Sequence, residues 1–404
     1  MVFPTQYQKF AGEIMNSKTT WIRIVKIAAV LLPAVLMILF MPVNDFGDAP
    51  RIRDFYLEEP NSLDVVVMGS SEDYAGYSPV LAYEEYGFTS YLYVFSANAF
   101  SLFPAQLEEV LRVQSPSMIL VDIGEMIRPK EDTVDTVLRQ FLAGIPFSQH
   151  KMELISQYGQ SEDVLSYYFP FIVNHGKADG KTMWEYIKTN NAIRRRGYSL
   201  LKGAISFTGS GENWDGPYVE PINTTGDLST IELPENVIKE CQLVLDACAK
   251  YPEVEFVFIN YPHRITTEER YLDYQLTNAA GEMIESYGYD FINLESMLDN
   301  IGLVPETDFY NNHHMNLYGQ YKTTRFLCDL LASEHGIAIR EQSEQTRSNW
   351  EDCVQYQHLY YQMFDELFHS REPWEFGYWM QEEAWLFEQL EARKEAETTS
   401  VAAQ

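Results

Sequence analysis

Short apolar runs and amphipathic segments alternate along most of the chain. The apolar runs are rich in Val, Ile, Leu and Phe, and such short runs bounded by turn residues are typical of buried parallel strands. The predicted strands are Leu63–Met68, Ser90–Phe95, Met118–Ile123, Glu253–Asn260 and Asp290–Leu294. The predicted helices are Pro79–Tyr86, Pro104–Val113, Glu235–Lys250, Thr267–Tyr287 and Tyr318–Ser333. This alternation predicts an α/β fold built on a doubly wound parallel sheet.

The alternation breaks twice. Residues 128–226 are predicted to be a helical, aromatic-rich insertion in an α/β domain that spans 61–340. Residues 341–394 are predicted to form an acidic helical extension, which contains Trp350, Trp374, Trp379 and Trp385. We expect these aromatic side chains to pack back on the domain or to bind a protein partner. Residues 395–404 are small and polar and are predicted to be a disordered tail.

One segment near the N-terminus is apolar on all sides. Residues 27–43 carry no charge, and Trp21 and Ile22 extend the segment on its N-terminal side. A membrane-spanning helix needs roughly 20 apolar residues, so we predict a transmembrane helix over 21–43. Two alternatives stay open. The first is a cleaved signal peptide, for which Gly47-Asp48-Ala49 is a poor cleavage site, and the second is a buried core helix.

The charges that flank this segment predict its orientation. Lys and Arg precede it, and Asp follows it closely. By the positive-inside rule, residues 1–20 are expected in the cytoplasm, and residues 44–60 are expected to link the helix to a domain on the other side. The predicted location is therefore the cell membrane, with a single pass and an extracytoplasmic main domain.

Composition excludes several classes of function. A formal net charge of −30 argues against a nucleic-acid partner, because phosphate binding needs clustered Lys and Arg. The four cysteines include no Cys-x-x-Cys pair, which argues against a zinc site. Cys241 and Cys248 share one face of a predicted helix and are expected to be buried thiols, although a disulfide elsewhere stays open for an exported domain. No metal or organic cofactor is implied.

Polar residues follow the predicted strands at the edge of the sheet where parallel α/β folds bind their ligands. Gly69-Ser70-Ser71-Glu72 follows the first strand, residues 96–99 follow the second, and Gly124-Glu125 follows the third. A loop from Asp308 to Asn316, with two adjacent histidines, precedes the last helix. A serine at a strand-to-helix turn has backbone N–H groups around it, and a distal histidine can take its proton. This combination fits acyl transfer or ester hydrolysis.

The order and placement of these features resemble the SGNH (GDSL-like) hydrolase family. In that family the nucleophilic serine lies in a Gly-x-Ser turn after the first strand, and the catalytic histidine lies near the C-terminal end of the domain, before a helix. Gly69-Ser70-Ser71 and His314-Met315-Asn316 match these two places. The resemblance covers residues 63–333 and implies a flavodoxin-like sheet of five parallel strands.

Two further stretches of the sequence resemble one branch of this family in particular. Residues 141–148 and 168–175 are similar to a membrane-anchored branch of the family found in Firmicutes. The Gly-Ser-Ser-Glu turn is also similar to that of the anchored D-alanyl-transfer protein of teichoic acid synthesis.

The resemblance assigns roles to residues of the turn and of the distal loop. Ser71 takes the position of the nucleophile, with Ser70 as the neighbouring alternative, and His314 takes that of the general base, with His313 as the alternative. The family acid stands three residues before the histidine, where this chain has Asn311. In a serine triad an Asp-to-Asn change costs about four orders of magnitude in turnover. Asp308, or a Ser-His dyad without an acid, is the alternative to Asn311.

The resemblance also implies an oxyanion hole with donors after the second and third strands. Ser96, Asn98 and Ala99 occupy the second place, which has no glycine, and Asn98 has a side-chain donor to offer. Gly124 and Glu125 stand at the third place, where the family has Gly-x-Asn-Asp. A glutamate carboxylate accepts hydrogen bonds, so Glu125 serves an oxyanion only when it is protonated. One missing donor typically costs roughly two to three orders of magnitude in rate.

These features lead to two hypotheses. The first is a membrane-anchored, extracytoplasmic serine esterase or O-acyltransferase that acts on acylated cell-envelope glycans or related substrates, with an envelope polysaccharide or acyl donor as its partner. The second is a catalytically degenerate module of the same fold that binds envelope glycan or an assembly partner, for which the extension over 341–394 offers a surface.

Overall fold

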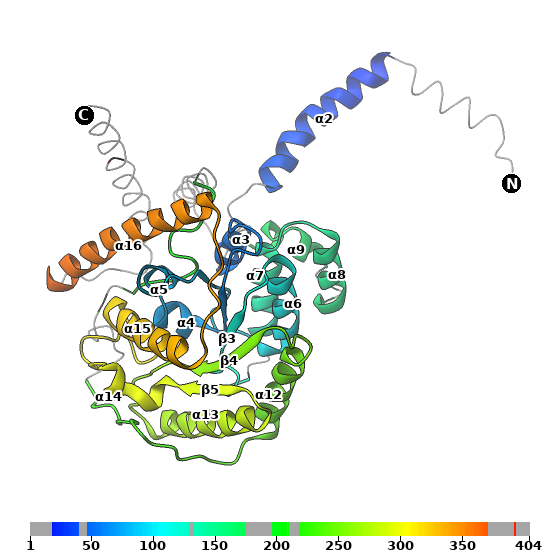
Figure 1. Ribbon diagram of the computed structural model, residues 1–404. Coiled ribbons are helices and arrows are strands. Elements are labelled where there is room, and N and C mark those ends of the chain that lie inside the picture. Colours follow the sequence, from blue (N-terminus) through cyan, green and yellow to red (C-terminus); the bar gives the residue numbers. More distant parts are fainter. Residues whose placement is uncertain are drawn as a thin grey trace, which may run out of the picture.

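The protein is an α/β protein with one sheet of five parallel strands (Figure 1). The computed structural model describes residues 18–39, 47–129, 133–160, 162, 164–174, 196–207, 209, 218–370 and 392. The strands are β1 (Val65–Met68), β2 (Ser90–Leu92), β3 (Met118–Asp122), β4 (Glu255–Asn260) and β5 (Asp290–Asn293). Their order in the sheet is β2-β1-β3-β4-β5, which is that of a doubly wound sheet whose switch point lies between β1 and β3.

All five predicted strands are present, and each is shorter than its prediction by one to three residues. Apolar residues extend beyond the hydrogen-bonded part of a strand because the loops that leave the sheet are also buried. Tyr93, Val94 and Phe95, for example, are fully buried although β2 ends at Leu92.

Side chains of the strands alternate between two cores, one on each face of the sheet. Val66 and Met68 of β1 belong to the core beneath helices α6 (Phe103–Val113), α12 (Glu235–Cys248) and α13 (Glu268–Ser286). Val65 and Val67 belong to the opposite core, which is covered by α4 (Ser71–Gly76) and α15 (Leu317–Glu334). A strand that is buried on both faces explains the unbroken apolar run in the sequence.

The other helices of the α/β domain are shorter connections. They are α5 (Pro79–Tyr86) and α14 (Leu298–Ile301), with single 3₁₀ turns at Phe100–Leu102 and Leu294–Met297. The predicted helices at 79–86, 104–113, 235–250, 267–287 and 318–333 are therefore all present, within two residues at each end.

The predicted insertion over 128–226 is helical in its first half, while the described residues 197–207 and 218–226 form turns and irregular segments. It contains α7 (Val134–Gly144), α8 (Gln149–Tyr158), α9 (Val164–Tyr168) and α10 (Phe171–Asn174). Residues 130–132, 161, 163, 175–195, 208 and 210–217 lie outside the described part of the chain.

The predicted linker over 44–60 is instead partly helical and packed. Helix α3 (Ala49–Phe55) begins with Pro50 in its first turn, and its Ile52 and Phe55 side chains are fully buried. A Cβ atom on Gly144 of α7 would collide with Ile52, so the two helices are in close contact. The sequence did not predict helix α3, because the apolar face of so short a helix gives little periodic signal.

Helix α2 (Lys18–Leu39) covers most of the apolar N-terminal segment and begins shortly before it. Its described side chains, from Thr20 to Pro33, are almost all exposed. In the residues that the structure describes, no helix has the length and hydropathy needed to cross a membrane. Residues 40–43 of the predicted transmembrane helix lie outside the described part.

Helix α16 (Glu344–Ser370) accounts for the described part of the predicted C-terminal extension. Trp350, Tyr356 and Phe364 of this helix are fully buried, and the Trp350 ring lies 4.8 Å from the ring of Tyr83 on α5. This part of the extension packs back on the domain, which was one of the two expected outcomes. Trp374, Trp379, Trp385 and the predicted tail from residue 395 lie outside the described residues.

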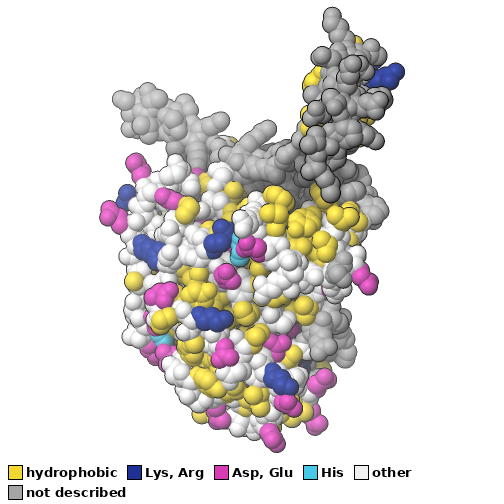
Figure 2. Space-filling model, turned by 90° about the vertical axis from the view of Figure 1, so that its right-hand side faces the viewer, with side chains coloured by type: hydrophobic (Ala, Val, Ile, Leu, Met, Phe, Trp, Pro, Cys, Tyr) yellow, Lys and Arg dark blue, Asp and Glu magenta, His cyan; other side chains and the backbone are white. Residues whose placement is uncertain are grey.

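Figure 2 shows one face of the molecule, on which the basic side chains do not form a cluster. On the face shown in Figure 2, Lys and Arg side chains lie singly among acidic and apolar ones. All four cysteines are free and buried, which confirms the prediction for Cys241 and Cys248.

Candidate active site

Ser71 is placed by a capped turn at the carboxyl end of β1. Ser70 is the N-cap of α4: its hydroxyl oxygen accepts from the Glu72 N–H at 3.3 Å, and its own N–H donates to Asp73 at 2.6 Å. The Ser70 hydroxyl also donates to Asp122, at the end of β3, at 3.0 Å. These bonds are fully buried and hold the turn from both sides, which leaves the partly exposed Ser71 as the first residue of the helix.

The Ser71 side chain meets His314, which comes from the distal loop. The Ser71 Oγ atom lies 2.9 Å from Nε2 of His314, and Nδ1 of His314 lies 3.2 Å from Oδ1 of Asn311. The loop that carries both residues closes on itself, with an antiparallel bridge between Phe309 and Met315 and a 2.9 Å bond from the Tyr310 N–H to the His314 carbonyl. Three residues named from the sequence thus form one hydrogen-bonded chain.

The backbone determines the direction of these hydrogen bonds. Oδ1 of Asn311 accepts the N–H groups of His313 and His314, both at 2.8 Å. Only the carbonyl oxygen of an amide can accept, so the oxygen and not the nitrogen of Asn311 faces the imidazole. Nδ1 of His314 must therefore carry the proton, and its Nε2 atom is left as the acceptor for the Ser71 hydroxyl.

The surroundings of His314 keep its imidazole neutral. Burial lowers the pKa of His314 to about 4, against an opposing effect of the Glu72 charge, and the charge of His263 lowers it further. The ring of Tyr74 stacks on the imidazole with a centroid distance of 6.2 Å, and that of Phe207 lies at 5.1 Å. A neutral imidazole in a fixed ring orientation is the form that can accept a proton from serine.

The alternatives considered for the base and the acid point elsewhere. His313 faces away from Ser71, and its Nε2 atom accepts from Arg270 at 3.0 Å. Burial, the first cause, and the nearby Arg270 lower the pKa of His313 to about 3. The buried Asp308 carboxylate pairs with Lys322 at 2.6 Å and accepts from the Val304 N–H at 2.7 Å. The Asp308 carboxylate is therefore engaged by the ammonium group of Lys322 and does not orient His314.

The predicted oxyanion residues lie at the carboxyl ends of the strands, as expected, but several of their N–H groups already donate hydrogen bonds to other side chains. The Ser96 N–H donates to Asp48 at 2.7 Å, and the Gly124 N–H donates to Asp122 at 3.0 Å. The buried Asn98 amide is paired with that of Gln106, with one bond in each direction at 3.2 and 3.0 Å. The arrangement therefore differs from an oxyanion hole built on these groups.

The other two predicted oxyanion residues have structural roles that the structure makes visible. The Ala99 carbonyl accepts from the Leu102 N–H at 2.9 Å and begins a 3₁₀ turn. Glu125 lies in the turn after β3; against the effect of burial, the charge of Glu72 and then that of Glu125 raise the pKa of Arg128. Ala97, beside them, has a φ of 48°, a left-handed conformation that glycine adopts more easily. The chain thus makes the turn after β2 without the glycine.

Two buried carboxyl groups lie beneath the nucleophile turn. Asp73 and Asp122 are both fully buried, and a Cβ atom on Gly69 would collide with both side chains, so the two groups lie close together. Burial raises the pKa of Asp122 to about 7, with the Glu72 charge as the next cause. Burial also raises the pKa of Asp73, and the charge of Asp122 adds to this. Like charges this close resist double ionisation, so the pair holds a proton near neutral pH.

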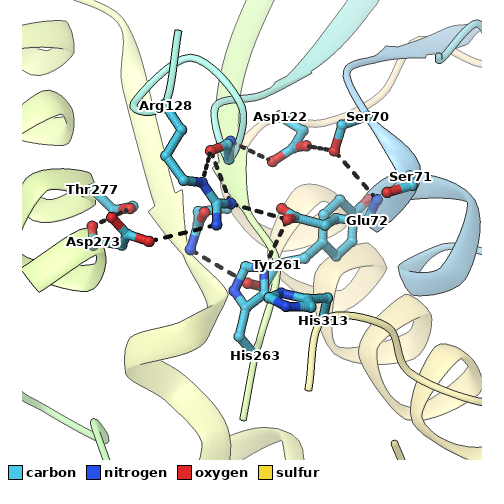
Figure 3. A network of polar contacts seen from close by, with 12 residues as sticks. Ser70, Ser71, Glu72, Asp122, Arg128, Tyr261, His263, Asp273, Thr277 and His313 are labelled. Carbon is cyan, nitrogen blue, oxygen red and sulfur yellow. Dashed lines mark hydrogen bonds and ion pairs between the residues drawn. The ribbon is translucent and has the colours of Figure 1, made fainter. Parts of the chain in front are cut away.

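An ionic network surrounds Glu72, the residue after the nucleophile (Figure 3). His263 lies between two carboxylates, 2.9 Å from Glu72 and 3.1 Å from Glu295. Arg128 lies 3.3 Å from Glu72 and 3.6 Å from Asp273. Burial lowers the pKa of His263, but the charges of Glu72 and Glu295 outweigh burial and raise it to about 10. The network ties α4 to β4 and α13.

Two arginines hold the histidine loop from the same side. Arg264 donates to the Asn312 side chain at 2.8 Å and through its backbone N–H to the Asn312 carbonyl at 3.0 Å, while Arg270 holds His313. Arg264 and Arg270 border a pocket with about 310 Å³ of empty space, and Arg128 and His263 line the same pocket. Most of their donors are engaged in these contacts, so the pocket wall positions the loop.

Sequence reasoning assigned no role to Glu72, Asp122 or the arginines of this network. Glu72 and Asp122 each had a local signal, because one follows Ser71 and the other ends a predicted strand at the binding edge of the sheet. Arg264 and Arg270 had none, because only the fold brings them to the histidine loop.

Comparisons and metal ligands complete the description of the site. Within the described ranges, His, Cys, Asp and Glu side chains form no group of three that could hold a metal ion. The chain matches no family model, and neither a curated protein nor a solved structure matches it.

Proposed function

We propose that this chain is a serine esterase or O-acyltransferase of the SGNH type, with a flavodoxin-like domain. The observation that carries the proposal is the hydrogen-bonded chain from Ser71 through His314 to Asn311, at 2.9 and 3.2 Å. Such a chain is the requirement for activating a serine hydroxyl, whose own pKa is far too high for attack at neutral pH. It lies at the switch point of the sheet, where doubly wound folds bind ligands.

The proposed reaction follows from the proton positions. Oγ of Ser71 attacks the carbonyl carbon of an ester while its proton passes to Nε2 of His314. The imidazolium then protonates the leaving alcohol, and an acyl group remains on Ser71. Water or an acceptor hydroxyl reverses these steps, which gives hydrolysis or transfer. No metal or organic cofactor takes part.

The proposed substrates are acylated cell-envelope glycans or related acylated compounds. The resemblance to anchored SGNH proteins supports this choice, together with the predicted export of the domain. The mechanism itself requires an ester carbonyl and an alcohol as leaving group or acceptor.

Anchoring in the membrane through residues 21–43 is part of the same proposal. It is supported by the uncharged run over 27–43 and by the exposed apolar side chains of α2, such as Val30 at 72%. The full chain is expected to stay with the membrane fraction after an alkaline carbonate wash, which removes peripheral proteins. Release of the full-length chain by this wash would contradict the anchor and leave the proposed chemistry untouched.

Covalent labelling tests the proposed chemistry. A fluorophosphonate probe is expected to label the wild-type chain and not Ser71→Ala, because an activated serine attacks the probe's phosphorus, displaces fluoride and becomes a phosphonate ester. Ser115→Ala is the matched control: it removes an exposed serine hydroxyl that bonds to Asn61 and not to the site, so labelling is expected to persist. A folded wild-type chain that takes up no label would sink the proposal.

A second candidate function is a catalytically degenerate module of the same fold. Two observations favour it: Asn311 is neutral, and the Ser96 and Gly124 N–H groups are already used. A hollow with about 760 Å³ of empty space, lined by Tyr318, Tyr321, Tyr361, Phe368, Lys322 and Arg325 among others, lies between α15 and α16. Aromatic rings with neighbouring polar groups suit a glycan or a protein partner. Absence of labelling with glycan binding retained would favour this candidate.

A further inference from the structure

An acyl-transfer site needs a donor for the oxygen that becomes negatively charged when serine attacks a carbonyl. The N–H groups of Ser96 and Gly124 donate to buried carboxylates, at 2.7 and 3.0 Å. Asn98 is held by Gln106. If the serine is a nucleophile, a side-chain donor beside it would add to the backbone N–H groups of its turn and replace these three.

Tyr74 brings a hydroxyl group to the nucleophile. It lies three positions after Ser71 on α4, so both side chains leave the same face of the helix. The side chain is 6% exposed. Its hydroxyl lies 3.3 Å from the Ser96 hydroxyl. Burial raises the pKa of Tyr74, and the nearby Ser71 hydroxyl is among the groups that oppose this rise. The Tyr74 hydroxyl therefore stands between the nucleophile and the turn after β2.

The Tyr74 ring is held by two neighbouring side chains. The imidazole of His314 stacks on it with an interplanar angle of 3°, and the guanidinium carbon of Arg51 lies 4.5 Å from the ring centroid. Arg51 is itself fixed by Asp48 at 2.5 Å. A ring held in this way keeps its hydroxyl in one place, which is the preorganisation that stabilises a transition state.

The positions of the protons on His314 and Ser71 determine whether the Tyr74 hydroxyl donates or accepts a hydrogen bond. Nδ1–H of His314 donates to Asn311, so Nε2 accepts the Ser71 proton, and the Ser71 oxygen can only accept a further bond. Burial, opposed by the charge of Arg51, raises the pKa of Tyr74, which keeps the phenol protonated. Between Tyr74 and Ser71, the phenol is therefore the donor.

We propose that Tyr74 is a further catalytic residue, whose hydroxyl donates a hydrogen bond to the oxyanion formed when Ser71 attacks an ester carbonyl. This inference rests on the proposed function. In the step, the Oγ–carbon bond forms, the π electrons move to the carbonyl oxygen, and the serine proton moves to His314. Oγ of Ser71 becomes an ester oxygen, which is a poor hydrogen-bond acceptor. The Tyr74 hydroxyl therefore donates its hydrogen bond to the adjacent oxyanion instead. The phenol proton is not transferred.

The test compares Tyr74→Phe with Tyr77→Phe. Each variant loses one buried tyrosine hydroxyl that bonds to a serine, since Tyr77 lies 3.0 Å from Ser90, but the Tyr77 hydroxyl is bonded away from Ser71. Hydrolysis of p-nitrophenyl acetate and the rate of fluorophosphonate labelling are measured on the full chain. Tyr74→Phe is expected to lower kcat by roughly 10²–10³-fold, the cost of one oxyanion donor, with KM unchanged. Tyr77→Phe is expected to keep the wild-type kcat.

A purely structural role of the Tyr74 ring predicts a different result. Phenylalanine retains the stacking on His314, so kcat would stay near the wild-type value. A role through the position of His314 would instead move the acid limb of the pH–rate profile, whereas loss of an oxyanion donor leaves that limb in place. Either result, in a wild-type chain that is labelled at Ser71, overturns the role of Tyr74 and leaves the proposed function standing. A wild-type chain that is neither labelled nor active overturns both.

Discussion

Asn311 shows how one backbone detail changes the meaning of a substitution. The expected cost of asparagine in a serine triad, about four orders of magnitude, arises mainly because the amide selects the wrong histidine tautomer. Here two backbone N–H groups at 2.8 Å turn the Asn311 oxygen toward His314, so the tautomer is the one that catalysis needs. What remains missing is the negative charge that stabilises the imidazolium.

Asn311→Asp supplies that charge without new packing, because a carboxylate accepts the same three donors. We expect it to raise the pKa of His314 and to raise kcat by about tenfold, which corresponds to ~1.4 kcal/mol. In the wild-type chain kcat/KM for p-nitrophenyl acetate should fall as the pH drops through about 4, where His314 gains its proton. In the variant this acid limb should lie at higher pH.

Asn312→Asp is the matched control for this experiment. It adds the same charge one position away, against Arg264 instead of His314. An equal shift of the acid limb in both variants would show that distant charge, and not the contact with Nδ1, controls His314.

Residues of the site were predictable where a role depends on chain order. Ser71 was predicted from its turn after the first strand, and His314 from its loop before the last helix. In the structure their side chains are in hydrogen-bond contact. Tyr74 was not predictable in the same way. Its role depends on which face of a six-residue helix meets the histidine loop, and no periodic pattern exists in so short a helix.

Elements with a full apolar face were predictable from the sequence, and short ones were not. The strands and the five predicted helices of the domain appear at their predicted places. Helices α3 and α4 have seven and six residues, less than two turns, and α3 was taken for part of a linker. Tertiary burial of Ile52 and Phe55, not local preference, keeps α3 helical.

Helix α16 is an element whose attachment can be measured. Trp350 has no exposed surface and contacts Tyr83 and Lys202 of the domain. Trp350→Ala removes a large buried ring and is expected to lower the free energy of unfolding by about 3–5 kcal/mol, as measured by urea denaturation. Gln355→Ala, at an exposed position of the same helix, should change it by less than about 0.5 kcal/mol. A small effect of Trp350→Ala would mean that α16 folds apart from the domain.

At the scale of the whole molecule, the sequence predicted the class of fold but not the contacts that cross it. Alternating strands and helices predict a parallel sheet. The strand order and the identity of the partners beneath the nucleophile turn depend on long-range packing. The carboxyl pair of Asp73 and Asp122, and the placement of His263 between Glu72 and Glu295, join segments far apart in the chain, and such pairings leave no local pattern.

Ser71 and His314 are 243 positions apart. A ribosome that adds about 5–20 residues per second completes the serine roughly 12–50 s before the histidine. Throughout that interval the growing chain carries a serine with no base beside it, and truncated products of translation share this state. The long separation therefore acts as a delay: under the proposed chemistry, acyl transfer begins only after nearly the whole α/β domain has been synthesised and folded.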